Sequence, residues 1–288
     1  MSLLLPSNVR GSHQHYFHLL LGNLVPLLGT PSLRPVLRSL VFPDAGPLTP
    51  LLQSYGISVV PFAEYKSLAI RHGLPPTLFT VNRFGREVID KAALDHLGIR
   101  ANTMSSRCVR LFPHDHPRLY ARGLATVAAN ALRLHGLAAA DALSTPAPSV
   151  VFVTRKPQSA FYDDTNQRCE MPTAGAARRS IPNADELCRA LATIADVAVV
   201  SLEGQTLVEQ MRIFATARLI IAQHGAALAN LAFCRPGTKV LEVFPRGSWN
   251  CFQPLAEMFQ LAYHRLPTAG PHEAVDVDAF LRAVRPLL

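Results

Sequence analysis

A histidine between two hydrophobic runs is the first residue of this sequence that suggests chemistry. Residues 219–245 read LIIAQHGAALANLAFCRPGTKVLEVFP, in which His224 ends one apolar run and Glu242 lies within the next. A histidine can donate to a phosphate oxygen or exchange a proton with a reacting group, and a carboxylate can accept from sugar hydroxyls. From spacing alone, a ligand site and a tight strand–helix crossover with a buried histidine are equally compatible with this pattern.

Small residues directly follow the histidine. Gly225, Ala226 and Ala227 would let a ligand approach the backbone. A helix that begins here would also present unpaired N–H groups and a partial positive charge, which together bind anions. The segment 224–227 is therefore predicted to form an anion site.

Alternating strands and helices are expected to position this segment. In the second half of the chain, strands are predicted over 149–155, 197–202, 218–222 and 238–244, and helices over 183–194, 206–217, 225–233 and 278–287. Apolar strands that alternate with helices indicate a parallel sheet covered on both faces, with ligands bound beyond the carboxyl ends of its strands. Asn183 and Glu186 predict a capping box at the first of these helices.

The first half shows a weaker form of the same alternation. Strands are predicted over 35–43 and 56–62, and helices over 48–56, 86–99 and 118–136. Residues 135–150 are small and end in two prolines, as linkers do. We therefore predict two α/β domains, 1–146 and 147–288.

Composition limits the classes of protein that remain. The chain has 288 residues, 49% hydrophobic and 17% charged, with a net charge of +8 and a mean hydropathy of +0.18. No apolar run approaches the roughly 20 residues that cross a bilayer, and no signal-peptide pattern is present, so we expect a cytoplasmic protein. The five cysteines contain no C-x-x-C pair and are expected to be reduced. The positive charge suits an anionic partner and leaves peripheral membrane contact open, but no dense basic–aromatic segment favours nucleic acid.

Motifs of other enzyme classes are weak or missing. An Asp-x-Asp metal motif occurs only at Asp276 and Asp278, where helix capping is the favoured role, and Asp163-Asp164 lies in a polar stretch and is expected to be solvated. The histidines that could suggest zinc lack the usual ligand spacing: His13, His15, His18, His114 and His116. No G-x-S-x-G, G-x-G-x-x-G or Walker A motif is present. We expect no metal and no cofactor.

The segment 201–245 resembles the signature of glycosyltransferase family 61. That family includes protein O-mannose and EGF-domain N-acetylglucosaminyltransferases, plant xylan-modifying enzymes and bacterial capsule-related homologues. The matching positions are Glu209, Gln210, His224, Gly225, Ala226, Leu228, Asn230, Phe233, Pro236, Gly237 and Glu242. Three further segments, 15–28, 151–157 and 177–187, resemble other family elements in the expected order.

The resemblance implies a fold, a reaction and a set of roles. It implies a GT-B-like architecture of two Rossmann-like domains facing a cleft, and an inverting, metal-independent transfer from a nucleotide sugar, with UDP expected, to a glycan or glycoconjugate acceptor. In such a site, Arg155, His224 and the 225–227 amides would hold the diphosphate, and Glu242 would contact the ribose. Asn230 would fix the turn within the donor site. Weaker candidates for the diphosphate are Lys156, Arg178 and Arg179.

One position departs from the family pattern. Relatives commonly carry an acidic residue four positions after the histidine that corresponds to His18, whereas this chain has Gly22. His18 is then the nearest candidate for the catalytic base. The alternative is a catalytically silent homologue that binds a nucleotide or sugar beside a true transferase. For the ribose role, the sequence predicts that Glu242→Ala weakens nucleotide affinity with a nearly unchanged melting temperature.

Overall fold

The protein consists of two compact units. The computed structural model describes residues 2–3, 16–25, 28, 40–46, 49–61, 63–65, 67, 102–105, 108–110, 117–137, 149–157, 175–248 and 250–288. The first unit contains the described residues up to Gly136 and the second those from Leu137 onward. The predicted boundary near residue 146 and the predicted helix over 86–99 lie outside the described residues, so the domain limits 1–146 and 147–288 stay a prediction.

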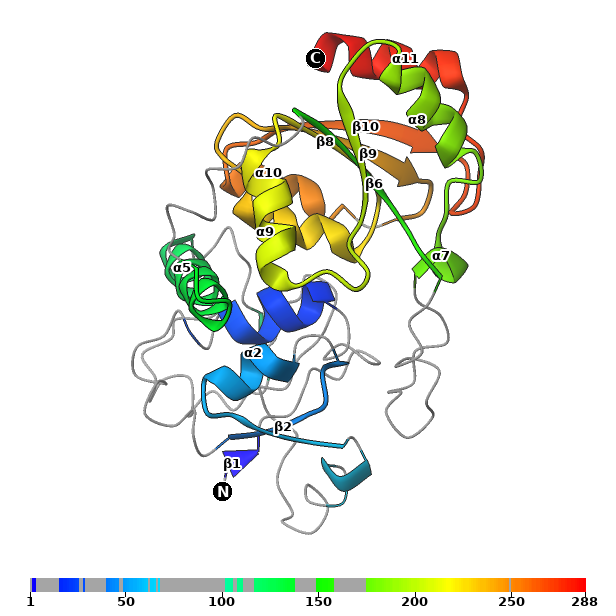
Figure 1. The fold of residues 1–288 in the computed structure, drawn as a ribbon. Helices are drawn as coiled ribbons and strands as arrows, with labels where there is room; N and C mark the ends of the chain where they lie inside the picture. Colours follow the sequence, from blue (N-terminus) through cyan, green and yellow to red (C-terminus); the bar gives the residue numbers. More distant parts are fainter. Residues whose placement is uncertain are drawn as a thin grey trace. The chain divides into compact units, whose positions relative to one another are not determined.

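The second unit is built on five parallel strands with helices on both faces (Figure 1). The strands are β6 (Val150–Thr154), β7 (Val197–Ser201), β8 (Leu219–Gln223), β9 (Lys239–Pro245) and β10 (Ala262–Thr268). Helices α8 (Ala184–Ala192) and α11 (Val277–Val284) cover one face, and α9 (Leu207–Thr216) and α10 (Phe252–Met258) cover the other. The 3-10 helix η7 (Ala226–Phe233) packs against α9 and α10. The predicted parallel α/β sheet is confirmed, although α10 and β10 are not predicted.

The direction of winding reverses between two neighbouring strands. The sheet order is β10-β9-β8-β6-β7, so the chain leaves β6 toward β7 and then crosses to β8 on the other side of β6. Doubly wound sheets bind ligands at this kind of reversal, outside the carboxyl ends of the strands. Arg155 follows β6 and His224 follows β8, so these two residues flank the reversal.

Side-chain alternation along the strands separates the core from the site. Phe152, Ile221 and Leu241 belong to the hydrophobic core that α8 and α11 cover, and the Phe152 ring meets Phe280 of α11 edge-on at 6.0 Å. Successive residues of a strand point to opposite faces. Glu242 therefore points to the face of α9, α10 and η7.

Helix starts in this unit confirm some sequence signals and correct one. Asp276 caps α11, because its carboxylate accepts from the Ala279 amide at 2.7 Å. Asn183 precedes α8 but forms no capping box; its amide group instead bonds both backbone groups of Val275, at 2.8 and 2.9 Å. A distant segment therefore competes successfully for the side chain that the local pattern assigned to the helix.

The capping box lies at the next helix. The Thr206 hydroxyl accepts from the Glu209 amide, and the Glu209 carboxylate accepts from the Thr206 amide at 2.7 Å. This pairing gives Glu209 a structural role at the start of the helix. It begins α9 at a defined residue.

The first unit contains two small sheets and, among its described residues, three helices with defined bounds. Strands β1 (Ser2–Leu3), β2 (Leu40–Pro43) and β3 (Ser58–Val60) form a parallel sheet, and β4 (Asn102–Ser105) pairs antiparallel with β5 (Cys108–Arg110). The helices are the π-helix η2 (His18–Leu24), α2 (Thr49–Ser54) and α5 (Pro117–Leu134). The predicted helices at 48–56 and 118–136 are confirmed, as is a strand within 56–62.

Close packing joins α5 to η2. The Tyr120 hydroxyl donates to the Leu21 carbonyl at 3.0 Å, and a Cβ added to Gly123 would lie 2.1 Å from the Val25 carbonyl oxygen. The glycine is therefore required for this approach. In the described part of the chain, no helix combines the length and the apolar character that a membrane span needs.

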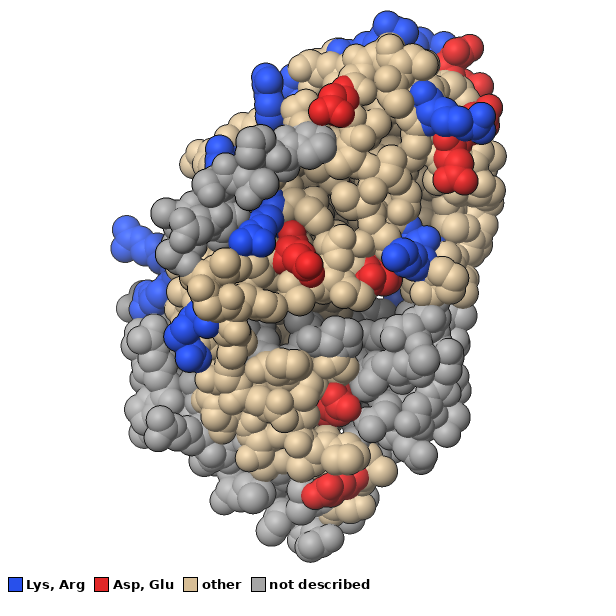
Figure 2. Space-filling view, viewed as in Figure 1, with Lys and Arg blue, Asp and Glu red and all other residues tan. Residues whose placement is uncertain are grey.

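The described positive charge is not gathered in one place on the face shown in Figure 2. On the face shown in Figure 2, the described Lys and Arg side chains form separate groups, and Asp and Glu side chains lie among several of them. This face does not present a continuous basic stripe of the kind that nucleic acids bind.

Candidate active site at the carboxyl edge of the five-stranded sheet

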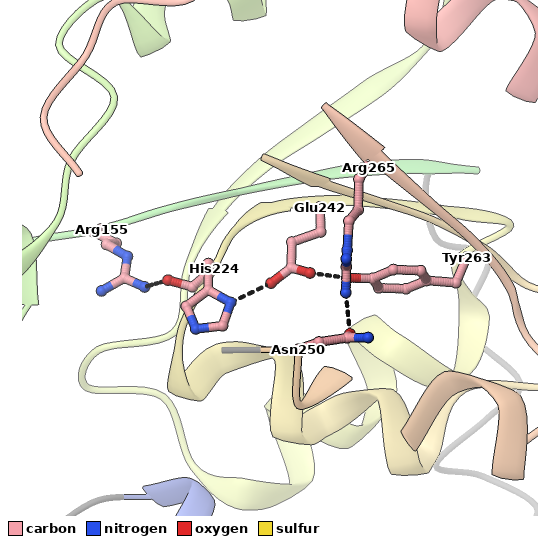
Figure 3. A network of polar contacts seen from close by, with 6 residues as sticks. All are labelled: Arg155, His224, Glu242, Asn250, Tyr263 and Arg265. Carbon is pink, nitrogen blue, oxygen red and sulfur yellow. Dashed lines mark hydrogen bonds and ion pairs between the residues drawn. The ribbon is translucent and has the colours of Figure 1, made fainter. Parts of the chain in front are cut away.

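A buried histidine–glutamate pair lies at the end of β8. The His224 amide donates to the Val243 carbonyl at 2.9 Å, which extends the contact between β8 and β9 by one residue. His224 Nδ1 then lies 2.6 Å from Glu242 Oε1 (Figure 3). The two residues are only 6% and 0% exposed.

The surroundings of the ring distinguish its two nitrogens. The His224 ring packs edge-on against Phe244 and Phe252, at 5.5 and 5.1 Å between centroids. Nδ1 faces the carboxylate, whereas Nε2 faces away from Glu242 and has no hydrogen-bond partner among the described residues (Figure 3). A carboxylate on Nδ1 favours a proton there, which leaves Nε2 for a ligand or a reacting group.

Three residues that sequence reasoning missed form a hydrogen-bonded network that reaches the other oxygen of Glu242 through Tyr263. The Tyr263 hydroxyl donates to Glu242 Oε2, and Arg265 Nε donates to the Tyr263 hydroxyl at 3.1 Å. The Arg265 guanidinium also donates to Asn250 and lies 4.4 Å over the Phe244 ring. The sequence signal for these contacts was the spacing of Tyr263 and Arg265, two residues apart and therefore on one face of a strand. It could not be used, because β10 is too polar to be recognised as a strand from its sequence pattern.

These contacts bear on the predicted role of Glu242. A carboxylate that is 0% exposed, with both oxygens occupied, serves to orient His224 as it stands. Its predicted contact with a ribose stays a prediction.

Arg155 supports the turn that carries the histidine. One guanidinium NH2 group donates to the His224 carbonyl at 2.8 Å and the other to the Gly175 carbonyl at 3.5 Å. A Cβ added to Gly225 would lie 1.8 Å from the nearer NH2 nitrogen. The space beside Gly225, which the sequence suggested for a ligand, is therefore occupied by the guanidinium. Arg155 and the 224–227 turn therefore lie at one edge of the sheet.

Three arginines gather at this edge. Burial lowers the pKa of Arg155 to about 10, and the charge of Arg179 is the next cause. Burial also lowers the pKa of Arg178, and burial with the charge of Arg178 lowers the pKa of Arg179. All three stay charged at neutral pH, and no carboxylate of the described residues lies within 4.0 Å of them. Neighbouring guanidinium groups without a paired carboxylate favour an anion. Lys156, in contrast, is exposed.

Backbone amides face the same edge. The helix that begins at Ala226 is a 3-10 helix, with Gly225 before it. Within the described segments, no acceptor binds the amides of Gly225, Ala226 and Ala227, as expected for the first residues of a helix. These amides can therefore donate to an anion.

Asn230 is tied to the neighbouring helix. It is 0% exposed, and its amide donates to the Ala227 carbonyl at 3.2 Å and to the Gln210 side chain at 3.0 Å. Gln210 in turn donates to the Gln205 carbonyl at 3.1 Å. These bonds fix the turn, the role expected for Asn230, and its contact with the donor stays a prediction.

Other predicted site residues are placed only in part. His18 begins η2 and Gly22 lies within it, but the His18 side chain is outside the described part of the chain. The remaining histidines of the two zinc-like clusters and the Asp163-Asp164 pair also lie outside it. Among the residues that are described, no group of three or more His, Cys, Asp and Glu could hold a metal ion.

The contact of Gly225 with Arg155 leads to a stability prediction. Gly225→Ala is expected to lower the free energy of unfolding by about 1–3 kcal/mol, because the new methyl group overlaps the guanidinium. In an Arg155→Ala background the overlap is gone, so the double variant should be more stable than the sum of the two single changes allows. Denaturant unfolding measures both quantities. Gly270→Ala is the control, because a Cβ there meets nothing within 4 Å. Additive effects of Gly225→Ala and Arg155→Ala on the free energy of unfolding would contradict the contact between Gly225 and the Arg155 guanidinium.

Comparison with known families was made on the whole chain. A family model described as Glycosyltransferase 61 matches residues 16–241, more than half of the 288 residues. The match begins two residues before His18 and includes Arg155, His224 and Asn230, and it ends one residue before Glu242. No curated protein matches the chain.

Proposed function

The chain belongs to glycosyltransferase family 61 and is a glycosyltransferase, and on this premise we propose that its donor is a nucleotide-diphosphate sugar, with UDP as the expected nucleotide. The acceptor that we propose is a glycan or glycoconjugate hydroxyl. The process is then polysaccharide or glycoconjugate synthesis in the cytoplasm, with contact to an anionic membrane surface left open by the net charge of +8.

The position of Arg155 and His224 at the reversal of the sheet supports this donor most directly. The guanidinium of Arg155 and the open Nε2 of His224 lie at one edge, joined by the 2.8 Å bond to the His224 carbonyl. An arginine has five N–H donors, and two of those of Arg155 bond to carbonyls of the described residues, at His224 and Gly175. The others, the 225–227 amides and Arg179 suit the oxygens of a diphosphate.

The reaction that we propose proceeds with inversion. The acceptor oxygen attacks the anomeric carbon of the donor from the side opposite the diphosphate. The bond from that carbon to the diphosphate oxygen breaks, and its electron pair leaves with the diphosphate. A base takes the proton of the acceptor hydroxyl, for which His18 remains the candidate.

Metal independence is part of the proposal. Negative charge grows on the departing diphosphate, and it must be compensated for the bond to break. The arginine cluster and helix amides supply positive charge at the site. His224 adds a further N–H when both ring nitrogens carry protons, because Glu242 balances the ring charge from within the protein.

The arrangement of the two units is also a proposal. In a GT-B-like enzyme, two Rossmann-like domains would face a cleft, with the donor on the second unit and the acceptor on the first. The parallel five-stranded sheet of the second unit suits the donor side.

A thermal-shift screen of nucleotides tests the donor site. UDP and UDP-sugars are expected to raise the melting temperature, by an amount equivalent to about 2.7 kcal/mol at a concentration of 100 Kd. EDTA should leave the shift unchanged, and uridine, which lacks phosphates, should give little shift. Loss of the shift in EDTA would contradict metal independence, and no shift from any nucleotide would contradict the donor site. Binding without release of free UDP in the presence of acceptor would favour the silent homologue, for which the glycine at position 22 is the motivation.

A further inference from the structure

The hydroxyl of Tyr263 has only one way to share its proton. A phenol oxygen carries one proton and can accept at its lone pairs. Arg265 has no acceptor group, so its Nε–H must donate to Tyr263, over 3.1 Å. The Tyr263 proton is then left for Glu242 Oε2, the other group in contact.

The same argument assigns the proton on His224. Glu242 accepts from Tyr263 at Oε2, so a carboxylate without a proton of its own fits that side. On the other side, Oε1 lies 2.6 Å from Nδ1, and a bond of that length requires a proton between them. With the carboxylate unprotonated, this proton belongs to Nδ1.

We infer that Tyr263 is a positioning residue, which keeps Glu242 ionised and the proton of His224 on Nδ1, so that the ring can take a second proton at Nε2 beside the donor. The value of this for transfer rests on the proposed function, because it assumes that Nε2 meets the diphosphate. The proton assignment itself needs only the contacts within the second unit.

Arg265 and Asn250 fix the direction of the tyrosine hydroxyl. Arg265 is the register partner of Glu242 on the neighbouring strand, and its guanidinium stacks on Phe244 at 4.4 Å while it donates to Asn250. These contacts hold Nε–H against the Tyr263 oxygen. The Tyr263 hydroxyl therefore cannot turn away from Glu242 Oε2 without losing the hydrogen bond from Arg265.

Loss of the Tyr263 hydroxyl should reverse the proton arrangement. In Tyr263→Phe, Oε2 of Glu242 has no donor although the residue is 0% exposed, and an unpaired buried carboxylate is costly. The carboxyl then takes the proton from Nδ1 and donates it back through Oε1. Nε2 takes a proton from solvent, and the ring stays neutral because no carboxylate is left to balance the charge of a second ring proton.

Nitrogen NMR of the imidazole tests the inference. In protein labelled with 15N-histidine at neutral pH, the Nδ1 signal of His224 should be of the protonated type in the wild type and of the unprotonated type in Tyr263→Phe; the signals are assigned by their loss in His224→Gln. Tyr55→Phe is the matched control, because it also removes a half-buried tyrosine hydroxyl, which donates to the Thr126 carbonyl at 3.1 Å, and it should change nothing at His224. An unprotonated Nδ1 in the wild type, which can be observed even if the variant fails to fold, would overturn the inference, as would a protonated Nδ1 that persists in Tyr263→Phe.

Kinetics separates this inference from the proposed function. The kcat for sugar transfer in Tyr263→Phe should fall about tenfold, the lower end of what outer partners of functional histidines contribute, with little change in donor KM. If the NMR change occurs but the wild type neither binds nor uses a nucleotide sugar, the proposed function is wrong and the positioning role stands. If transfer occurs and kcat in Tyr263→Phe equals that of the wild type, the positioning role is wrong and the proposed function stands.

Discussion

Glu242→Gln is expected to lower the kcat of sugar transfer by at least about 10²-fold, because it removes the carboxylate that balances a charged His224 ring and leaves the ring neutral, with its one proton on Nε2. Tyr263 donates to this side chain, so the amide oxygen of the glutamine must face Tyr263. Its NH2 group then faces Nδ1, which has to become an acceptor with the ring proton on Nε2. A steady-state transfer assay on the purified variant measures the effect.

Glu242→Ala should in addition destabilise the fold. The sequence alone predicts a nearly unchanged melting temperature for this change. With Glu242 0% exposed and bound at both oxygens, we expect instead a loss of about 3–5 kcal/mol, typical of removing one partner of a buried pair. Glu257→Gln, an exposed carboxylate on α10 of the same unit, is the control and should change neither quantity. A Glu242→Gln variant that keeps wild-type kcat would refute the orienting role.

The fold of the second unit could be predicted where apolar strands alternate with helices. Strands such as β6 and β8 are buried along their length, so their hydrophobic runs are continuous and identify a parallel sheet. β10 escaped prediction because its sequence, AYHRLPT, mixes polar residues and a proline with apolar ones, whereas β7 at the opposite edge of the sheet is an apolar run and was predicted. The Asn183 side chain escaped for a different reason: its partner, Val275, lies 92 residues away.

The candidate site could be predicted as a location but not as a network. Parallel strands place the residues after their carboxyl ends at one edge, and this rule alone brings Arg155 to the 224–227 turn. It cannot show that the guanidinium fills the space beside Gly225, because that contact depends on a side-chain conformation. The rule also could not show that Tyr263 donates to Glu242, because the strand that carries Tyr263 was not predicted.

The residues of the family signature fall into two groups by their place in the structure. Glu209, Gln210 and Asn230 form bonds that begin α9 and tie it to η7, away from any exposed surface in the case of Asn230. His224 and Gly225 lie at the edge itself. The family signature therefore includes residues that support the site as well as residues that form it. The presence of a residue in the signature does not by itself assign that residue to ligand binding.

Arg155→Met is expected to weaken UDP binding by roughly tenfold to a hundredfold, because a hydrogen bond to a charged group contributes about 1.5–3 kcal/mol. Methionine keeps an unbranched side chain beside Gly225 but has no donor for a phosphate oxygen or for the His224 carbonyl. Arg155→Lys should recover little of the affinity, since one ammonium cannot reproduce the planar fork that reaches two carbonyls and a ligand together. Isothermal titration with UDP measures all three proteins.

Loss of the charge must be separated from loss of support for the turn. Arg189→Ala removes an exposed arginine of α8 in the same unit, and it should leave UDP affinity unchanged if the effect is local rather than due to net charge. A damaged turn would weaken every ligand of the site, whereas a lost phosphate contact should weaken UDP much more than uridine. Arg155→Met with wild-type affinity for UDP would show that the guanidinium only braces the His224 carbonyl, and the diphosphate would then have to be held by Arg179 and the amides of η7.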